Sequence, residues 1–197
     1  MTTDLGPHDD TPDLRDDLRA TTDWVAALVA GTRPDQLAAP TPCTEWTVRD
    51  LLSHLVAVLD RVRVIGAGDD PFSVPSQLAA EPPDWATAFR NRAQQVWPVW
   101  DDASLTRTVT VPPGRPVPGA VALGHYVVEY LVHGWDLATA TGQSAEAPAD
   151  LATRALAAAQ HAIPAEPRQA PLPFGPVQTP PADAGPTRRL AAWLGRP

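Results

Sequence analysis

Apolar residues recur every three or four positions along most of the chain, which is the period of a helix that buries one face. The first such stretch covers residues 12–30, where Leu18, Val25 and Leu28 fall on one face and Gly31 follows. Glycine is common just beyond the last turn of a helix because it adopts the left-handed conformation without strain. We therefore expect the first helix over residues 12–30.

The second apolar stripe begins at a recognisable helix start. Thr47 and Asp50 resemble a capping pair, in which each side chain accepts a hydrogen bond from the other residue's backbone N–H. The stripe predicts a helix over residues 47–65. A third helix is expected to begin at Asp84, a favoured N-cap residue, and Pro98 should kink or shorten it.

The second half of the chain contains one candidate strand and three further helices. Residues 106–111 alternate Thr with Val and Arg before a Pro-Pro-Gly turn, which favours a short strand or hairpin arm. The most apolar helix is expected over residues 119–140 and should be the most buried. An alanine-rich helix over residues 149–163 and a short helix over residues 187–194 follow.

Four or five antiparallel helices, joined by loops too long for a coiled coil, are typical of a compact bundle. We therefore predict an all-α fold, a four-helix bundle with a possible short hairpin. A chain of 197 residues is long enough for one domain with a substantial core. Residues 1–197 should form that domain, with residues 1–12 frayed and residues 164–197 forming a proline-rich tail with a short terminal helix.

Composition and charge exclude several classes of protein. Hydrophobic residues make up 44% of the chain and charged residues 19%, which is typical of a globular protein. The net charge of -8 argues against nucleic-acid binding, which needs clustered cations. No apolar run reaches the roughly 18 residues of a membrane span, and residues 1–17 lack the basic and apolar regions of a signal peptide. We expect a cytoplasmic protein with neither nucleic acid nor membrane as a partner, and a homodimer through exposed helix faces is compatible with this composition.

The helix expected over residues 119–140 carries the residues that point to chemistry. His125, Glu129 and His133 are spaced four apart, and steps of four residues advance only about 40° around a helix. The three side chains therefore share one face, and Asp136 falls in the same arc. A Glu and a His at positions i and i+4 can both reach one metal ion, because their Cβ atoms lie about 6 Å apart.

A third ligand should come from a helix that faces this one, as in other metal sites of helical bundles. His54 is the best candidate, because it lies on the flank of the second apolar stripe. Two imidazoles and a carboxylate would leave coordination positions open, which is typical of catalytic rather than structural zinc. A closed structural site would call for several thiolates, and Cys43 is the one cysteine of the chain.

Structural roles compete with metal binding at each of these residues. A partly buried histidine is more often hydrogen-bonded to its neighbours than bound to a metal, and a Glu–His pair at i, i+4 contributes roughly a few tenths of a kcal/mol on its own. His125 could be a ligand, a hydrogen-bond donor to a ligand or a proton carrier. Trp46 is assigned a packing role at the start of a helix, and His161 is expected on the surface.

Two motifs at these positions resemble those of an actinobacterial protein family. The first is residues 41–55, which read TPCTEWTVRDLLSHL and resemble that family's TPC-x-W-TVRDLL-x-HL segment. The second is residues 131–138, which read LVHGWDLA and resemble its VHGWDLA motif; residues 174–177 and 194–197 resemble its tail. The family comprises metal-binding proteins similar to the N-terminal domain of mycothiol-dependent maleylpyruvate isomerase, within the DinB-like superfamily of four-helix bundles.

This resemblance implies a ligand set and a class of cosubstrate. A divalent metal, usually written as zinc, would be bound by a histidine of the second helix and an E-x-x-x-H pair of a later helix, which here are His54, Glu129 and His133. Nickel is also compatible with two imidazoles and a carboxylate. In the isomerase the metal works with a low-molecular-weight thiol, so mycothiol is the cosubstrate that the resemblance implies.

The resemblance and the open ligand set together suggest a divalent-metal-binding protein that acts as a thiol S-transferase or isomerase on a small electrophile. Its partners would be a small-molecule thiol and that electrophile, and no catalytic residue is assigned. No long C-terminal domain of the isomerase type is recognisable in this sequence, which argues against the isomerase's own reaction. The alternative is a non-enzymatic, metal-dependent small-molecule binding or regulatory module, and a metal-free bundle would retain the motif only for packing.

Overall fold

The computed structural model describes residues 12–44, 46–166, 168 and 174–197. The prediction that residues 1–12 fray therefore falls almost wholly outside the described residues. Among the helices that are described, none combines the length and the apolarity that crossing a membrane requires.

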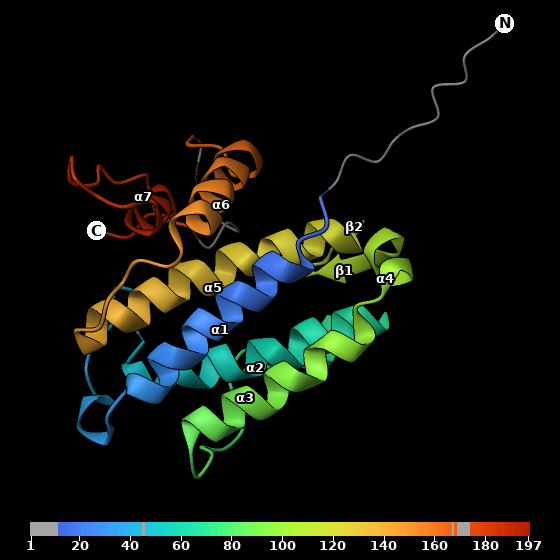
Figure 1. The fold of residues 1–197 in the computed structure, drawn as a ribbon, viewed down its shortest axis with the longest axis horizontal. Coiled ribbons are helices and arrows are strands. Elements are labelled where there is room, and N and C mark those ends of the chain that lie inside the picture. The colour runs from blue at the N-terminus through green and yellow to red at the C-terminus, as the bar shows by residue number, and fades with distance from the viewer. Residues whose placement is uncertain (1–11, 45, 167, 169–173) are drawn as a thin grey trace, which may run out of the picture.

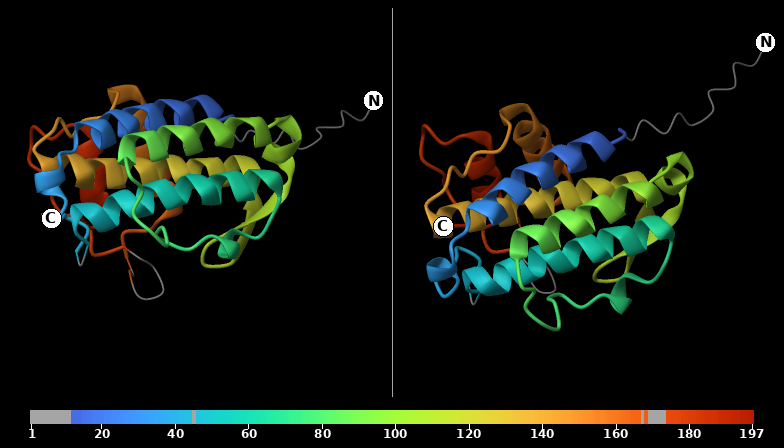
Figure 2. Two further views of the ribbon diagram at one scale, coloured as in Figure 1. Left: turned by 90° about the horizontal axis from the view of Figure 1, so that it is seen from below. Right: turned by 60° about the horizontal axis from the view of Figure 1, so that its bottom comes forward.

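Four long helices run alongside one another and enclose the core (Figures 1 and 2). They are α1 (Arg15–Gly31), α2 (Val48–Ala67), α3 (Trp85–Val96) and α5 (Gly119–Thr141). Helix α1 packs against α5 and α3, and α2 packs against the same two helices, so the four form a closed ring of contacts. The apolar stripes predicted these four helices to within a few residues at each end.

The ends of α2 and α3 follow from local side chains. The Thr47 hydroxyl accepts a hydrogen bond from the Asp50 N–H, and the Asp50 carboxylate accepts one from the Thr47 N–H, which confirms the predicted capping pair. Asp84 caps α3 through the Thr87 N–H. Helix α3 gives way to a 3-10 turn, Trp97–Val99, that contains Pro98, because proline cannot donate the next helical hydrogen bond.

A β-hairpin makes the fold mostly helical rather than all-α. A short helix, α4 (Asp102–Thr106), leads into β1 (Thr108–Val111), which pairs antiparallel with β2 (Arg115–Pro118). Val109 lies opposite Val117, and both are buried. The strand and a possible hairpin were foreseen from the Thr–Val alternation and the Pro-Pro-Gly turn, but the residues of the second strand were not, because the prolines of β2 hide its strand pattern.

Two further helices pack on one side of the bundle. Helices α6 (Ala149–Ala162) and α7 (Pro186–Trp193) contact each other and α5 (Figure 1). Leu190 of α7 and Leu194, just beyond it, are fully buried. The segment 174–197 is therefore attached to the bundle through apolar contacts, and it brings its side chains close to α5.

Gly134 allows α1 to approach α5 closely. A Cβ atom at this position would overlap the ring of Trp24 and would lie 3.0 Å from Val25 Cγ2. We expect Gly134→Ala to lower the free energy of unfolding by about 1–3 kcal/mol, because overpacking outweighs the gain in helix propensity. Urea unfolding measures this. Gly124→Ala, in the same helix, meets only the flexible Leu14 Cδ1 at 3.1 Å and should be neutral or stabilising; equal effects of the two substitutions would contradict the packing argument.

Candidate metal centre

The structure brings together the three residues that were predicted as metal ligands. His54 comes from α2, and Glu129 and His133 come from successive turns of α5, which packs against α2. One potential ligand atom from each of the three residues lies within 4.8 Å of the other two. The two histidines are almost fully buried, with 6% and 9% of their surface exposed, while the Glu129 side chain is 22% exposed. Three donors therefore converge at the edge of the core.

The ring of His54 is oriented by a backbone carbonyl. Its Nδ1 lies 2.8 Å from the carbonyl oxygen of Ser76, and a carbonyl can only accept a hydrogen bond. Nδ1 therefore carries a hydrogen, and Nε2 faces the Glu129 carboxylate, 3.1 Å from its Oε1. A cation, either a proton or a metal ion, must lie between Nε2 and Oε1, since otherwise two lone pairs would face each other.

The segment that supplies this carbonyl is attached to α2 at two more points. Arg61 Nη2 donates to the carbonyl oxygens of Val74 and Pro75, at 3.0 Å each. The Leu78 N–H donates to Ser53 Oγ at 2.9 Å. The loop beside His54 is thus fixed by side chains from one face of α2, and it holds the imidazole in place.

The ring of His133 is oriented by a buried carboxylate. Its Nδ1 lies 3.1 Å from Asp136 Oδ2, and Asp136 also accepts hydrogen bonds from Arg196, whose Nε lies 2.9 Å from Oδ1 and whose Nη2 lies 2.8 Å from Oδ2. The side chain of Asp136 has no exposed surface. Because Asp136 pairs with Arg196 as a carboxylate, Nδ1 of His133 carries the hydrogen. Nε2 therefore offers a lone pair, as expected for a metal-binding histidine with a carboxylate partner.

Electrostatics keep both acids charged. Burial by itself would raise the pKa of Glu129, but the hydrogen bond with His54 and the positive charge that His54, His133 and His125 carry when protonated outweigh it and hold the pKa well below its ordinary value. Burial likewise opposes the charge of Asp136, and the hydrogen bonds from His133 and Arg196 lower its pKa on balance. The lowered pKa of Glu129 favours a carboxylate beside the two imidazoles of the centre.

Trp46 belongs to the site, although the sequence suggested only a packing role. Its ring stacks on His133 with centroids 5.7 Å apart and planes at 23°, and it tilts against His54 at 4.7 Å. The residue directly precedes the Thr47 cap, so the start of α2 places the indole over both ligand rings. No sequence signal pointed to this contact, because it depends on how α2 meets α5.

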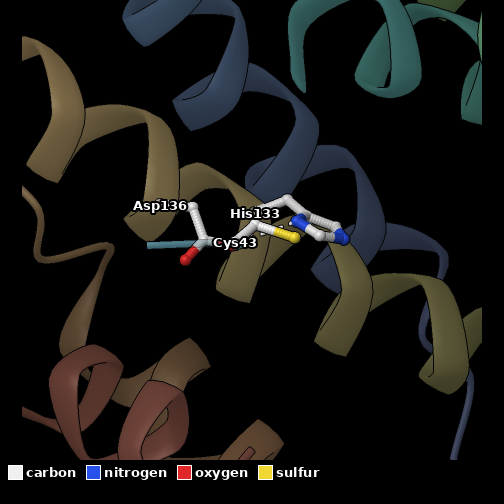
Figure 3. A group of neighbouring side chains, drawn as sticks. All are labelled: Cys43, His133 and Asp136. Carbon is white, nitrogen blue, oxygen red and sulfur yellow. Dashed lines mark hydrogen bonds and ion pairs between the residues drawn. The ribbon is translucent and has the colours of Figure 1, made fainter. Parts of the chain in front are cut away.

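Cys43 also lies beside the site, which spacing along the chain did not suggest. Its sulfur, a nitrogen of His133 and a carboxylate oxygen of Asp136 lie within 4.8 Å of one another (Figure 3). Burial raises the pKa of the Cys43 thiol, which favours its neutral form. Both oxygens of Asp136 already accept hydrogen bonds from Arg196, and Oδ2 also accepts one from His133. The set with His54 and Glu129 is therefore better suited to a cation than the set with Cys43.

His125 lies at the rim of the centre. Its side chain is 42% exposed, and its Nε2 lies 3.7 Å from Glu129 Oε2. The spacing correctly placed it on the face of Glu129 and His133. His161, expected on the surface, is exposed on α6.

Comparisons of the sequence with known proteins give a family match and two relatives. Residues 18–138 match the family described as the mycothiol maleylpyruvate isomerase N-terminal domain. Uncharacterised proteins from two strains of Mycobacterium tuberculosis are each 36% identical over 175 residues, which cover 88% of this chain and 92% of theirs.

Solved structures of mycothiol-dependent maleylpyruvate isomerase share the fold. One has a TM-score of 0.53 and 16% identity, and it covers 74% of this chain and 68% of that chain. A histidine-to-alanine mutant of that enzyme gives the same TM-score at 15% identity. The family model matches more than half of the chain, so the chain belongs to the mycothiol maleylpyruvate isomerase N-terminal domain family.

Proposed function

We propose that the protein binds one divalent metal ion through His54, Glu129 and His133, in a bundle of the DinB-like type, and uses it to bind a small-molecule thiol. The observation that carries this proposal is the orientation of the two histidines. Each has its Nδ1 occupied, by the Ser76 carbonyl or by the Asp136 carboxylate, so that Nε2 is left as the donor toward the site.

The donor set fits a divalent ion. Two neutral imidazoles and one carboxylate suit zinc, and nickel is also compatible. Glu129 stays ionised without a neighbouring arginine or lysine that would compete for its oxygens, since its described close partners are His54 and His125. Three protein ligands leave positions for an exogenous group, which distinguishes this set from a closed structural site.

The thiol in this proposal comes from the family. The related solved enzyme is named as mycothiol-dependent, and we infer that mycothiol or a similar thiol is the group that completes the site here. When bound, the metal would lower the pKa of that thiol and supply a thiolate for attack on a small electrophile. Such an activity would be a thiol S-transferase or an isomerase reaction.

The protein's own residues would orient and shield the reacting groups. Trp46 covers both imidazoles and limits the access of water from one side. His125 is exposed and its Nε2 lies 3.7 Å from Glu129 Oε2, so it is placed to exchange a proton with a group bound at the rim. Asp136 holds His133 in the tautomer that binds a metal through Nε2.

The burial of the donors favours a second candidate, a non-enzymatic binding or regulatory module. His54 and His133 expose only 6% and 9% of their surface, and the ring of Trp46 packs against both imidazoles. An enzyme would need room for an electrophile beside the metal, so turnover separates the two candidates.

A thiol titration of the cobalt-loaded protein tests the proposal. Mycothiol should produce a sulfur-to-cobalt charge-transfer band in the wild type. This band should be absent in His54→Ala. A fully cobalt-loaded protein that shows no such band and binds no thiol would overturn the thiol proposal. Accelerated consumption of the thiol when an alkylating reagent is added, or isomerisation of maleylpyruvate with the thiol regenerated, would then favour the enzyme over the binding module.

A further inference from the structure

Arg196 connects the segment after α7 to the candidate metal centre. Its guanidinium is mostly buried, with 12% of the side chain exposed, and it contacts Asp136, which lies 60 residues away along the chain. We propose that Arg196 is a positioning residue of the metal centre, which sets the affinity for the ion by fixing Asp136 and, through it, His133. The inference rests on the proposed metal site and adds a residue to it.

The contact between Arg196 and Asp136 fixes the plane of the carboxylate. Nε donates to Oδ1 at 2.9 Å and Nη2 donates to Oδ2 at 2.8 Å, so the two planar groups meet at two points. Water cannot take over this task, because Asp136 has no exposed surface. The same Oδ2 accepts the hydrogen bond from His133 Nδ1 at 3.1 Å. The orientation of the imidazole therefore depends on a residue that has no ligand atom of its own.

The backbone after α7 directs Arg196 inward. Gly195 has a φ of 91°, a left-handed conformation that favours glycine, and the Arg196 N–H donates to the Ala191 carbonyl at 2.9 Å. Leu190 and Leu194 anchor the same turn in the core. Docking of α7 on the bundle thus delivers the guanidinium to Asp136.

This arrangement makes docking and metal binding thermodynamically linked. If the docked Arg196 strengthens metal binding by some factor, metal binding must strengthen docking by the same factor. The α7 segment should therefore be more protected when the metal is present, even though none of its residues belongs to the proposed ligand set.

Zinc titrations of four proteins test the first half of the inference. Removing the hydrogen-bond partner of a metal ligand commonly weakens metal affinity by about 10- to 100-fold. Arg196 acts on His133 through Asp136, so we expect a loss of about 10-fold, the lower end of this range, for Arg196→Ala. Arg196→Lys keeps the positive charge but cannot contact both oxygens of Asp136 in the same way, so it should recover part of the lost zinc affinity. Arg189→Ala is the matched control, because the Arg189 side chain is exposed and its one hydrogen bond among the described residues goes to the Ala184 carbonyl. The zinc affinity of this variant should equal that of the wild type.

The outcomes separate this inference from the proposed function. A wild type that binds zinc, with a folded Arg196→Ala that binds it equally well, would leave Arg196 a purely structural role and overturn the inference alone. A wild type that binds no zinc would overturn both.

Hydrogen exchange tests the second half of the inference, the linkage between metal binding and docking of α7. The experiment uses the wild type, so it remains decisive if Arg196→Ala fails to fold. Amide exchange over residues 186–196 should slow when zinc is added to the wild type, and it should not slow in His54→Ala, which lacks a ligand but keeps Arg196. Unchanged exchange in this segment on saturation of the wild type with zinc would contradict the proposed linkage.

Discussion

Zinc, at about a hundred times its dissociation constant, is expected to raise the midpoint of thermal unfolding of the wild type by about 5–10 °C, and His133→Ala should abolish this increase. Ligand binding at that concentration stabilises the native state by about 2.7 kcal/mol, and about 2–4 °C per kcal/mol is usual for a domain of this size. His133 supplies Nε2 to the proposed site, and the two remaining ligands would bind zinc far more weakly. Differential scanning calorimetry with and without zinc measures the increment.

The quantity to compare is the zinc-induced rise of the unfolding midpoint, not the midpoint itself. His133→Ala also loses the hydrogen bond to Asp136 and should be less stable without any metal. His161→Ala is the control, since His161 is exposed on α6; it should keep the full increment. A wild type whose unfolding midpoint does not respond to zinc or to a chelator would instead support the metal-free bundle.

Asp136→Asn is expected to lower the free energy of unfolding by about 3–5 kcal/mol, even without metal. The substitution keeps the shape of the side chain but leaves the mostly buried Arg196 without its charged partner. Removing one partner of a buried ion pair costs this much, because the charge of the other partner is left buried and uncompensated. Chemical denaturation of the metal-free protein measures the change.

The matched control applies the same substitution to a surface ion pair. Asp35 pairs with Arg33 at 3.0 Å, but both side chains are more than half exposed. Asp35→Asn should therefore change the stability by less than about 1 kcal/mol. Similar losses in the free energy of unfolding for Asp35→Asn and Asp136→Asn would show that the Asp136–Arg196 pair stabilises the fold no more than an exposed ion pair does.

The helices of the bundle could be predicted because their signals are local. The capping pair at Thr47 and Asp50, the cap at Asp84 and the break at Pro98 each act within one turn of the residue concerned. A hairpin was expected after residue 106, but the bounds of its second strand could not be predicted in this way. Its sequence, Arg-Pro-Val-Pro, becomes a strand only because β1 lies beside it.

The residues of the site also divide into those that local spacing places together and those that depend on packing between distant segments. Glu129 and His133 share a helix face, so their spacing is enough to place them together. His54 lies on another helix, where its position on the flank of an apolar stripe made it the best candidate, and the resemblance to a family motif supported that choice. Trp46, Cys43 and Arg196 were missed as members of the site because their contacts depend on how loops and α7 pack against α5.

Elemental analysis of the protein purified without an affinity tag tests the central claim most directly. A centre built from His54, Glu129 and His133 predicts about one divalent ion per chain in the wild type and almost none in His54→Ala. Circular dichroism of the same samples should show equal helix content, so that loss of metal is not loss of fold. A folded wild type that carries no ion after incubation with zinc or nickel, or a His54→Ala variant that retains as much metal as the wild type, would contradict the account.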